Sequence, residues 1–232
     1  MERNQLGRRE AMAMLGAAGA ALIAGCGDTT PASPTTTTGG AATGGSTTAA
    51  CAVTPTETVG PYPSLTDLIR SDIREGKSGT ALTLAMTVVN TNNNCAPLES
   101  VQVEIWQCDA TGNYSQYGSQ AAQTFLRGIQ TTNSDGGVTF TTIYPGWYQG
   151  RATHIHVEVS RNGSSLKVTQ IAFPESTNAT VYATGVYAAR GSNPTSNARD
   201  NIFADSIDSE LATVSGDPAS GVTASFRIGI AA

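Results

Sequence analysis

The chain has 232 residues, of which 39% are hydrophobic, 13% charged and 6% aromatic, and its formal net charge is −5. It is too long for a disulfide-stabilised miniprotein and too apolar for a wholly disordered chain. An acidic chain without a stripe of Lys and Arg argues against nucleic acid as the partner. The composition therefore predicts a globular domain with no nucleic-acid partner.

Residues 1–25 predict an export signal. Arg8 and Arg9 precede a run of apolar residues that is shorter than the roughly 20 residues needed to span a bilayer. The paired arginines resemble a twin-arginine signal, with the general secretory route as the alternative. Leu22–Cys26 resembles the lipobox of bacterial lipoproteins, so a lipid on Cys26 is expected to hold the exported protein at the cell envelope. An ordinary signal peptide is the alternative.

Residues 26–50 predict a disordered tether. Between residues 27 and 50 there are nine Thr, five Gly, no aromatic residue and one charge, Asp28. Such a segment buries too little apolar surface to offset the entropy lost on ordering. A Gly-rich coil of this length reaches about 25–30 Å, which is enough to hold the following domain clear of a membrane.

Three cysteines follow Cys26, and an exported chain folds where cysteines can pair. Cys95 and Cys108 flank a predicted strand, whose rise of about 3.3 Å per residue holds them too far apart for a bond that needs Cα atoms within about 7 Å. We therefore expect Cys51 to pair with one of these two, and the sequence does not choose between them.

Residues 51–232 predict one all-β domain. A short helical turn is expected over residues 65–69, capped by Ser64, and no long amphipathic helix is evident. Hydrophobic residues then recur at every second position, as is typical of half-buried strands. The runs are Leu82–Val88, Val101–Ile105, Ile155–Val159 and Val222–Ile230. The predicted architecture is a β-sandwich of mainly antiparallel strands.

The two histidines of the chain, His154 and His156, occupy alternate positions of a predicted strand. Residues i and i+2 of a strand point to the same side, with Cα atoms about 6.6 Å apart. Both rings can therefore converge on one ion at about 2.1 Å. The spacing predicts a two-histidine metal site, with a pair of surface histidines that bind nothing as the alternative.

The remaining metal ligands are restricted by composition. Two histidines are too few for a copper–zinc superoxide dismutase-like site, and a cupin normally supplies a third. The sequence lacks the G-x-S-x-G motif that a serine hydrolase would need, and it lacks the C-x-x-C motif that a zinc ribbon would need. Carboxylates, thiolates or phenolates must complete the site. Tyr114 and Tyr148 lie in turn-rich segments that can fold beside the histidines, and phenolate is a hard donor suited to ferric iron.

Four segments carry a family resemblance. They are Thr54–Tyr62 (TPTETVGPY), Val103–Ser115 (VEIWQCDATGNYS), Phe125–Gly128 (FLRG) and Thr142–His156 (TIYPGWYQGRATHIH). Together they resemble the intradiol ring-cleavage dioxygenases, in particular compact exported bacterial members, over nearly all of residues 51–232. One departure is Gln107, where exported relatives frequently have a histidine that is not a ligand.

The resemblance implies the metal and its ligands. The family binds non-haem Fe(III) with two tyrosinates and two histidines, and Tyr114, Tyr148, His154 and His156 match these four positions. By resemblance, Tyr148 is the tyrosinate that leaves the iron when a catechol binds and accepts a proton as it goes, while Tyr114 stays bound. The implied fold is a β-sandwich, as the alternation also predicts.

Two further residues match catalytic positions of the family. Arg151 matches an arginine that stabilises negative charge on the substrate ring, and Gln170 matches an active-site glutamine. The resemblance implies an enzyme that cleaves a small aromatic diol between its hydroxyls with O2, giving a muconate-type diacid. A non-catalytic β-sandwich that binds carbohydrate or another surface is the alternative. The catechol derivative and the oligomeric state are not predicted.

Overall fold

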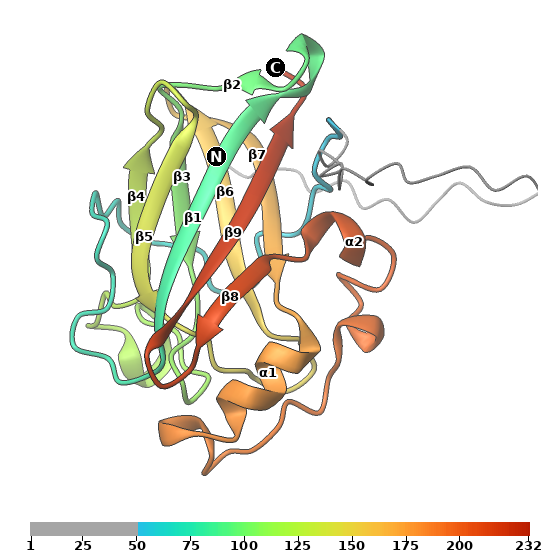
Figure 1. The fold of residues 1–232 in the computed structure, drawn as a ribbon. Helices are drawn as coiled ribbons and strands as arrows, with labels where there is room; N and C mark the ends of the chain where they lie inside the picture. Colours follow the sequence, from blue (N-terminus) through green and yellow to red (C-terminus); the bar gives the residue numbers. More distant parts are fainter. Residues whose placement is uncertain (1–50) are drawn as a thin grey trace, which may run out of the picture. The chain divides into compact units, whose positions relative to one another are not determined.

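The computed structural model describes residues 51–232, so the predictions for the export signal, the tether and Cys26 lie outside the described residues. Two β-sheets form the framework of this part of the chain (Figure 1). The predicted β-sandwich is therefore confirmed. Within residues 51–232, no helix is both long and apolar enough to cross a bilayer.

The five-stranded sheet is organised around β1 (Ala81–Asn90). On one side, β9 (Gly221–Ile230) runs parallel to β1, and β8 (Thr213–Asp217) pairs antiparallel with β9. On the other side, β5 (Gly137–Ile143) and the short β2 (Ala96–Pro97) pair antiparallel with different parts of β1. The first long strand and the last strand of the domain are thus neighbours.

The four-stranded sheet carries the two histidines. Its spatial order is β4 (Arg127–Thr131), β3 (Gln102–Trp106), β6 (His154–Arg161) and β7 (Ser164–Ala172). All three pairings are antiparallel, and the register places His156 between Trp106 of β3 and Gln170 of β7. The end of β3, the start of β6 and the end of β7 therefore meet at one end of the sandwich.

The alternation of hydrophobic residues produces the core. Inward-facing side chains from both sheets form one buried cluster, in which Leu84, Ile105 and Val157 are each 0% exposed. Burying a side chain of this size contributes about 1.5–3 kcal/mol. Because strand residues alternate, His154 and His156 lie on the face of β6 that points away from this cluster.

The helical segments are short. They are α1 (Glu175–Tyr182), α2 (Ile207–Glu210), η1 (Thr91–Asn93), η2 (Gly118–Gln120), η3 (Gly185–Tyr187) and η4 (Asn197–Arg199). The sequence did not indicate α1, because the helix buries only Asn178, Val181 and Tyr182 and so has almost no hydrophobic periodicity.

The predicted helical turn over residues 65–69 is wrong. This segment bends instead, and Ile69 forms a parallel bridge with Ile129 of β4. The N–H of Leu65 donates to Gln116 Oε1 at 2.7 Å, and the N–H of Ile129 donates to the carbonyl oxygen of Leu68 at 2.7 Å. Hydrogen bonds to neighbouring segments have replaced the local bonds that a helical turn needs.

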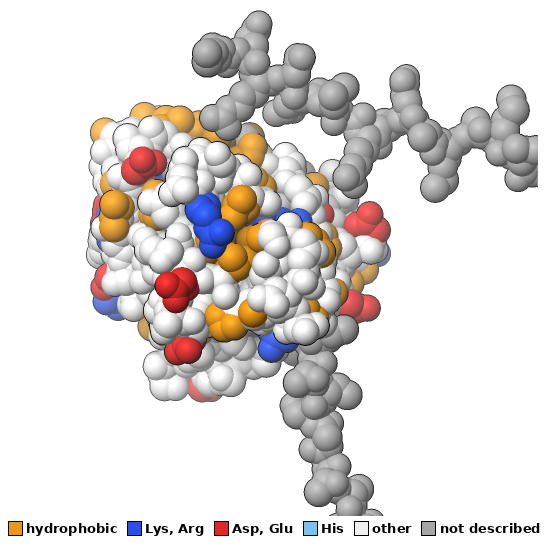
Figure 2. All heavy atoms as spheres, turned by 90° about the horizontal axis from the view of Figure 1, so that it is seen from above, with side chains coloured by type: hydrophobic (Ala, Val, Ile, Leu, Met, Phe, Trp, Pro, Cys, Tyr) orange, Lys and Arg blue, Asp and Glu red, His pale blue; other side chains and the backbone are white. Residues whose placement is uncertain are grey.

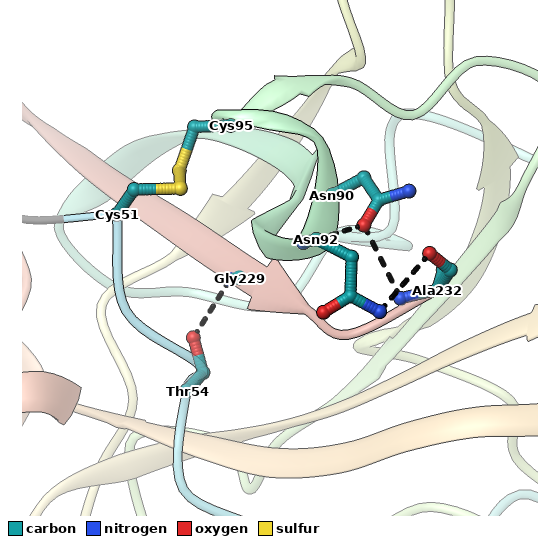
Figure 3. Close-up of a disulfide and its surroundings, with 7 residues drawn as sticks. All are labelled: Cys51, Thr54, Asn90, Asn92, Cys95, Gly229 and Ala232. Atoms are coloured by element: carbon teal, nitrogen blue, oxygen red, sulfur yellow. Dashed lines mark hydrogen bonds between the residues drawn. A yellow bond between two sulfur atoms is a disulfide. The ribbon is translucent and has the colours of Figure 1, made fainter.

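A disulfide fixes the first described residue. Cys51 is bonded to Cys95, with Cα atoms 5.6 Å apart, which ties residue 51 to the chain between η1 and β2 (Figure 3). The expectation that Cys51 is paired is confirmed, and Cys95 is the partner. Cys108 is free and buried.

Residues 51–64, which we call the N-terminal strap, cross from the five-stranded sheet to the four-stranded sheet. The N–H of Thr54 donates to the carbonyl of Gly229 at 3.0 Å, and the N–H of Gly229 donates to Thr54 Oγ1 at 2.9 Å (Figure 3). Further along, the N–H of Glu57 donates to the carbonyl of Val168 in β7 at 2.9 Å. The strap is therefore held by both sheets.

Candidate metal centre

Four potential metal donors converge at the end of the sandwich where β6 begins. The Nε2 atoms of His154 and His156 lie 3.1 Å apart. The phenol oxygens of Tyr114 and Tyr148 lie 3.4 and 3.3 Å from His154 Nε2. Tyr114 is 40 residues away from His154 in the sequence. The structure thus brings together all four residues that the family resemblance selected.

The loops that carry the two tyrosines pack against each other through glycines. A Cβ on Gly112 would lie 2.4 Å from the carbonyl oxygen of Trp147, and a Cβ on Gly146 would lie 2.3 Å from that of Asp109. Gly112 also has a φ of +85°, which is costly for other residues. The two turns can therefore approach closely enough to bring both phenols to the histidines.

His154 has a defined tautomer. Its Nδ1 lies 2.6 Å from the carbonyl oxygen of Ala152, which can only accept a hydrogen bond, so Nδ1 carries the proton. The lone pair of Nε2 then points toward the phenols and His156. Burial, followed by the nearby Arg151 cation, lowers the pKa of His154 to about 3. The ring is neutral at physiological pH, which is the state that binds metals.

His156 is also neutral and buried. Burial lowers its pKa well below the usual value, and His154 adds to this effect. Figure 2 shows no histidine on the face that it presents, in agreement with exposed fractions of 2% for His154 and 0% for His156. The alternative of two surface histidines is therefore excluded.

The two tyrosines differ in burial. Tyr114 is 4% exposed, whereas Tyr148 is half-buried. Burial raises the pKa of both phenols, and the Arg151 cation partly opposes this effect at Tyr148. Both phenols are thus protonated at neutral pH in the protein alone, and only a strongly charged cation would displace their protons.

No three His, Cys, Asp or Glu side chains gather as a metal-binding group within residues 51–232. Of the four converging residues, only the two histidines belong to these residue types. A metal ion at this centre would therefore depend on phenol oxygens, which favour a hard, highly charged cation.

Arg151 is held next to this centre by two side chains. Its Nε donates to Asp200 Oδ2 at 2.9 Å, and its Nη2 donates to Gln170 Oε1 at 2.6 Å. The Nε2 group of Gln170 donates in turn to the carbonyl of Thr58 in the strap at 3.0 Å. The structure thus brings Arg151 and Gln170 together.

Asp200 is a site residue that sequence reasoning missed. It is 0% exposed, and besides Arg151 it accepts hydrogen bonds from the N–H groups of Ala152 at 2.5 Å and Ile202 at 2.8 Å. Burial alone raises its pKa, but these hydrogen bonds and Arg151 outweigh it, so the pKa lies below the usual value. Residues 193–201 look like a plain polar loop, and no spacing rule links Asp200 to Arg151, 49 residues earlier.

Tyr62 of the strap forms an aromatic wall beside the donors. Its ring stacks on Tyr114 with centroids 4.6 Å apart and meets Tyr148 edge-on at 6.2 Å. Its carbonyl oxygen accepts a hydrogen bond from Nη1 of the fully buried Arg127 at 3.0 Å. The strap is therefore a part of this site rather than a passive extension of the domain.

Comparison with known proteins places this fold and site in a family. A family model described as "Dioxygenase" matches residues 59–192. The structure is similar to an intradiol ring-cleavage dioxygenase from Tetranychus urticae, with a TM-score of 0.70 and 30% identity, over 78% of this chain and 95% of that one. The chain belongs to the family of intradiol ring-cleavage dioxygenases.

Two other relatives are less similar. The first has a lower TM-score, and the second matches a smaller part of its own length. The dioxygenase domain of a dioxygenase–carbohydrate-binding fusion from Streptomyces sp. SirexAA-E is 29% identical, over 77% of this chain and 97% of that one, with a TM-score of 0.59. Catechol 1,2-dioxygenase from Candida albicans is 34% identical in a match that covers 40% of this chain. That match spans only 38% of the Candida protein.

Proposed function

We propose that this protein is an Fe(III)-dependent intradiol dioxygenase, which cleaves a catechol-type ring between its two hydroxyl-bearing carbons with O2 and gives a muconate-type diacid. The observation that carries the proposal is the convergence of Tyr114, Tyr148 and His156 on His154, with their donor atoms 3.1–3.4 Å from His154 Nε2. The family membership supports a dioxygenase reaction, and the donor set supports the metal.

The donor set fits ferric iron. Donor atoms about 2.1 Å from a shared ion lie about 3.0–3.4 Å from one another when the angles between them are near 90–110°. Two neutral imidazoles and two phenols that ionise on binding match the preference of a trivalent cation for hard ligands. Bound there, ferric iron would orient a catecholate through both of its oxygens and make its ring electron-rich toward O2.

Tyr148 is the residue we assign to proton transfer. It is half-buried and lies on a loop, whereas Tyr114 is enclosed by Tyr62 and the sheet. The oxygen of an ionised phenol would accept the proton of a substrate hydroxyl, and the less enclosed phenol is the one with room to move. We therefore assign Tyr114 as the permanent ligand and Tyr148 as the exchangeable one.

Arg151 is the residue we assign to charge stabilisation. Its guanidinium lies close enough to both His154 and Tyr148 to lower the pKa of each. Asp200 and Gln170 fix its orientation before substrate arrives. A preorganised cation stabilises negative charge that develops on the substrate ring without having to move during the reaction.

We also propose that the protein works outside the cytoplasm, held at the cell envelope by a lipid on Cys26. The Cys51–Cys95 disulfide supports export, because such bonds persist in oxidising compartments. Mass spectrometry of the purified full-length protein tests the proposal, since a lipidated Cys26 requires cleavage after residue 25. An intact N-terminus in membrane fractions would contradict it.

The decisive experiment combines colour with turnover. Purified protein loaded with ferric iron should show a visible tyrosinate-to-iron absorption band, consume O2 with a panel of substituted catechols and yield ring-cleaved diacids. Tyr114→Phe should weaken and shift the band, because Tyr148 would remain as the single tyrosinate donor. Tyr117→Phe is the matched control, because Tyr117 donates to the carbonyl of Pro63 and supplies no converging donor. Iron-loaded protein that is colourless and consumes no O2 would favour the non-catalytic binding module instead.

A further inference from the structure

The two histidines of the centre are oriented in different ways. His154 donates its Nδ1 proton to the carbonyl of Ala152. Nδ1 of His156 is buried and has no hydrogen-bond partner within the described residues. Histidines that bind metals almost always donate their second N–H to a protein group, which fixes the ring. Something other than a hydrogen bond must therefore fix the ring of His156.

Two residues pack directly on that ring. Trp106, its neighbour in β3, lies parallel to it with centroids 4.9 Å apart and an angle of 4° between the planes. Gly60 of the strap lies so close that a Cβ there would be 2.9 Å from His156 Cε1, a distance that real Cβ atoms do not reach. Cε1 is the carbon between the two ring nitrogens, so a contact at this atom influences the direction in which Nε2 points.

The strap holds Gly60 in this position. The N–H of Gly60 donates to Thr58 Oγ1 at 3.2 Å, and the carbonyl of Thr58 accepts from Gln170 in β7 at 3.0 Å. Gly60 has a φ of +74°, a conformation that residues with a Cβ adopt at a cost. The backbone therefore presents a glycine, without a side chain, to the edge of the His156 ring.

We propose that Gly60 and Trp106 are positioning residues for His156, and that they fix the direction of Nε2 by packing in place of the missing hydrogen bond. The inference rests on the proposed iron site. A side chain at residue 60 would push Cε1 away from the strap and turn Nε2 away from the shared centre. Loss of the indole at residue 106 would leave the ring free to rotate.

The first test compares two glycines. Gly60→Ala adds a Cβ against His156, whereas Gly76→Ala adds one at the same φ of +74° with nothing within 4 Å. Both variants should lower the melting temperature of the iron-free protein because both strain the backbone, and Gly60→Ala should lower it further because its Cβ also displaces the His156 ring. Only Gly60→Ala should weaken ferric-iron binding, by roughly 10- to 100-fold, as measured by titration against a competing chelator.

The second test changes Trp106, the other residue that packs on the His156 ring. It also tests the proposal if the Gly60→Ala variant does not fold. Trp106→Phe keeps an aromatic ring beside His156, and Trp106→Leu removes it. Iron affinity should fall at least 10-fold from the phenylalanine to the leucine variant, with a shift of the tyrosinate absorption band. Equal iron affinity in both variants, or wild-type affinity in folded Gly60→Ala, would overturn the proposal. If the wild-type protein itself binds no iron, the proposed function fails instead.

Discussion

The outer faces of the two sheets differ sharply. On the five-stranded sheet, Thr83, Thr223 and Ser225 point away from the core and are exposed to solvent. On the four-stranded sheet, the equivalent outward positions hold Trp106, His156 and Gln170, and all are at most 1% exposed. The same alternation of residues thus leads to a solvated face on one sheet and a buried polar face on the other.

The N-terminal strap accounts for this difference. It covers the outward face of the four-stranded sheet, and Gly60 and Tyr62 contact the histidine and tyrosine rings there. Polar groups covered in this way need partners, and their pKa values move with burial. A β-sandwich therefore gains a second, polar interior when a segment outside its sheets closes over one of them.

The largest effect is expected from a ligand on the buried face. His156→Ala should remove bound iron and lower turnover by at least ~10³-fold, because the metal and the charge stabilisation that it supplies are lost together. Thr223→Ala, on the exposed face of the other sheet, is the control and should change turnover by less than about twofold. A His156→Ala variant that keeps both colour and turnover would contradict the assignment.

The anchor of the strap should have the next largest effect. The Cys51–Cys95 disulfide closes a loop of 44 residues. A cross-link of this length lowers the entropy of the unfolded chain and so raises the free energy of unfolding by about 4 kcal/mol. Urea unfolding of the Cys51→Ala/Cys95→Ala double variant should show a loss approaching this value. Reductant should destabilise the wild-type protein and leave the double variant unchanged. A loss below about 1 kcal/mol would argue that the remaining hydrogen bonds hold the strap by themselves.

Asp200 should affect catalysis without affecting the metal. Asp200→Asn keeps the shape of the side chain but removes the charge that pairs with Arg151. We expect kcat to fall by roughly 100-fold, as for loss of a preorganised charge-stabilising group, while iron content stays the same. The exposed Asp208→Asn variant is the matched control. A kcat within twofold of wild type would show that Gln170 alone is enough to orient Arg151.

The smallest effect concerns pH and stability at Glu210 of α2, which accepts a hydrogen bond from Thr169 of β7. Burial raises the pKa of Glu210 to about 7, so the folded protein holds a proton that the unfolded chain releases near pH 4.5. Stability from this group is fully present below about pH 4.5 and is lost as the pH rises through 7. Glu210→Gln should therefore gain roughly 2 kcal/mol over wild type between pH 5 and pH 8. The exposed Glu99→Gln should show no such gain.

Local patterns predicted the parts of the site that lie within one segment. The period of two placed His154 and His156 on one face of a strand and Val157 in the core, and all three lie there. The four-residue constellation with Tyr114 and Tyr148 needed the family resemblance. No periodicity in the sequence specifies which loops meet at the end of a sheet.

The prediction of a helical turn over residues 65–69 is wrong, and the role of Asp200 was missed, for the same reason. In both segments, the hydrogen-bond partner lies far away in sequence: Gln116 for Leu65, and Arg151 for Asp200. Local propensity is weak where long-range hydrogen bonds compete with it.

The sequence by itself determined the sandwich, because strands with one apolar face and no long amphipathic helix to cover it bury that face by packing sheet against sheet. It also determined that His154 and His156 share one strand face. Only the tertiary structure decided that the strap covers this face, that Cys95 is the partner of Cys51, and that Gly60 and Trp106 enclose His156. These features depend on contacts between segments that are distant along the chain, and burial created by those contacts is what gives the polar groups their chemistry.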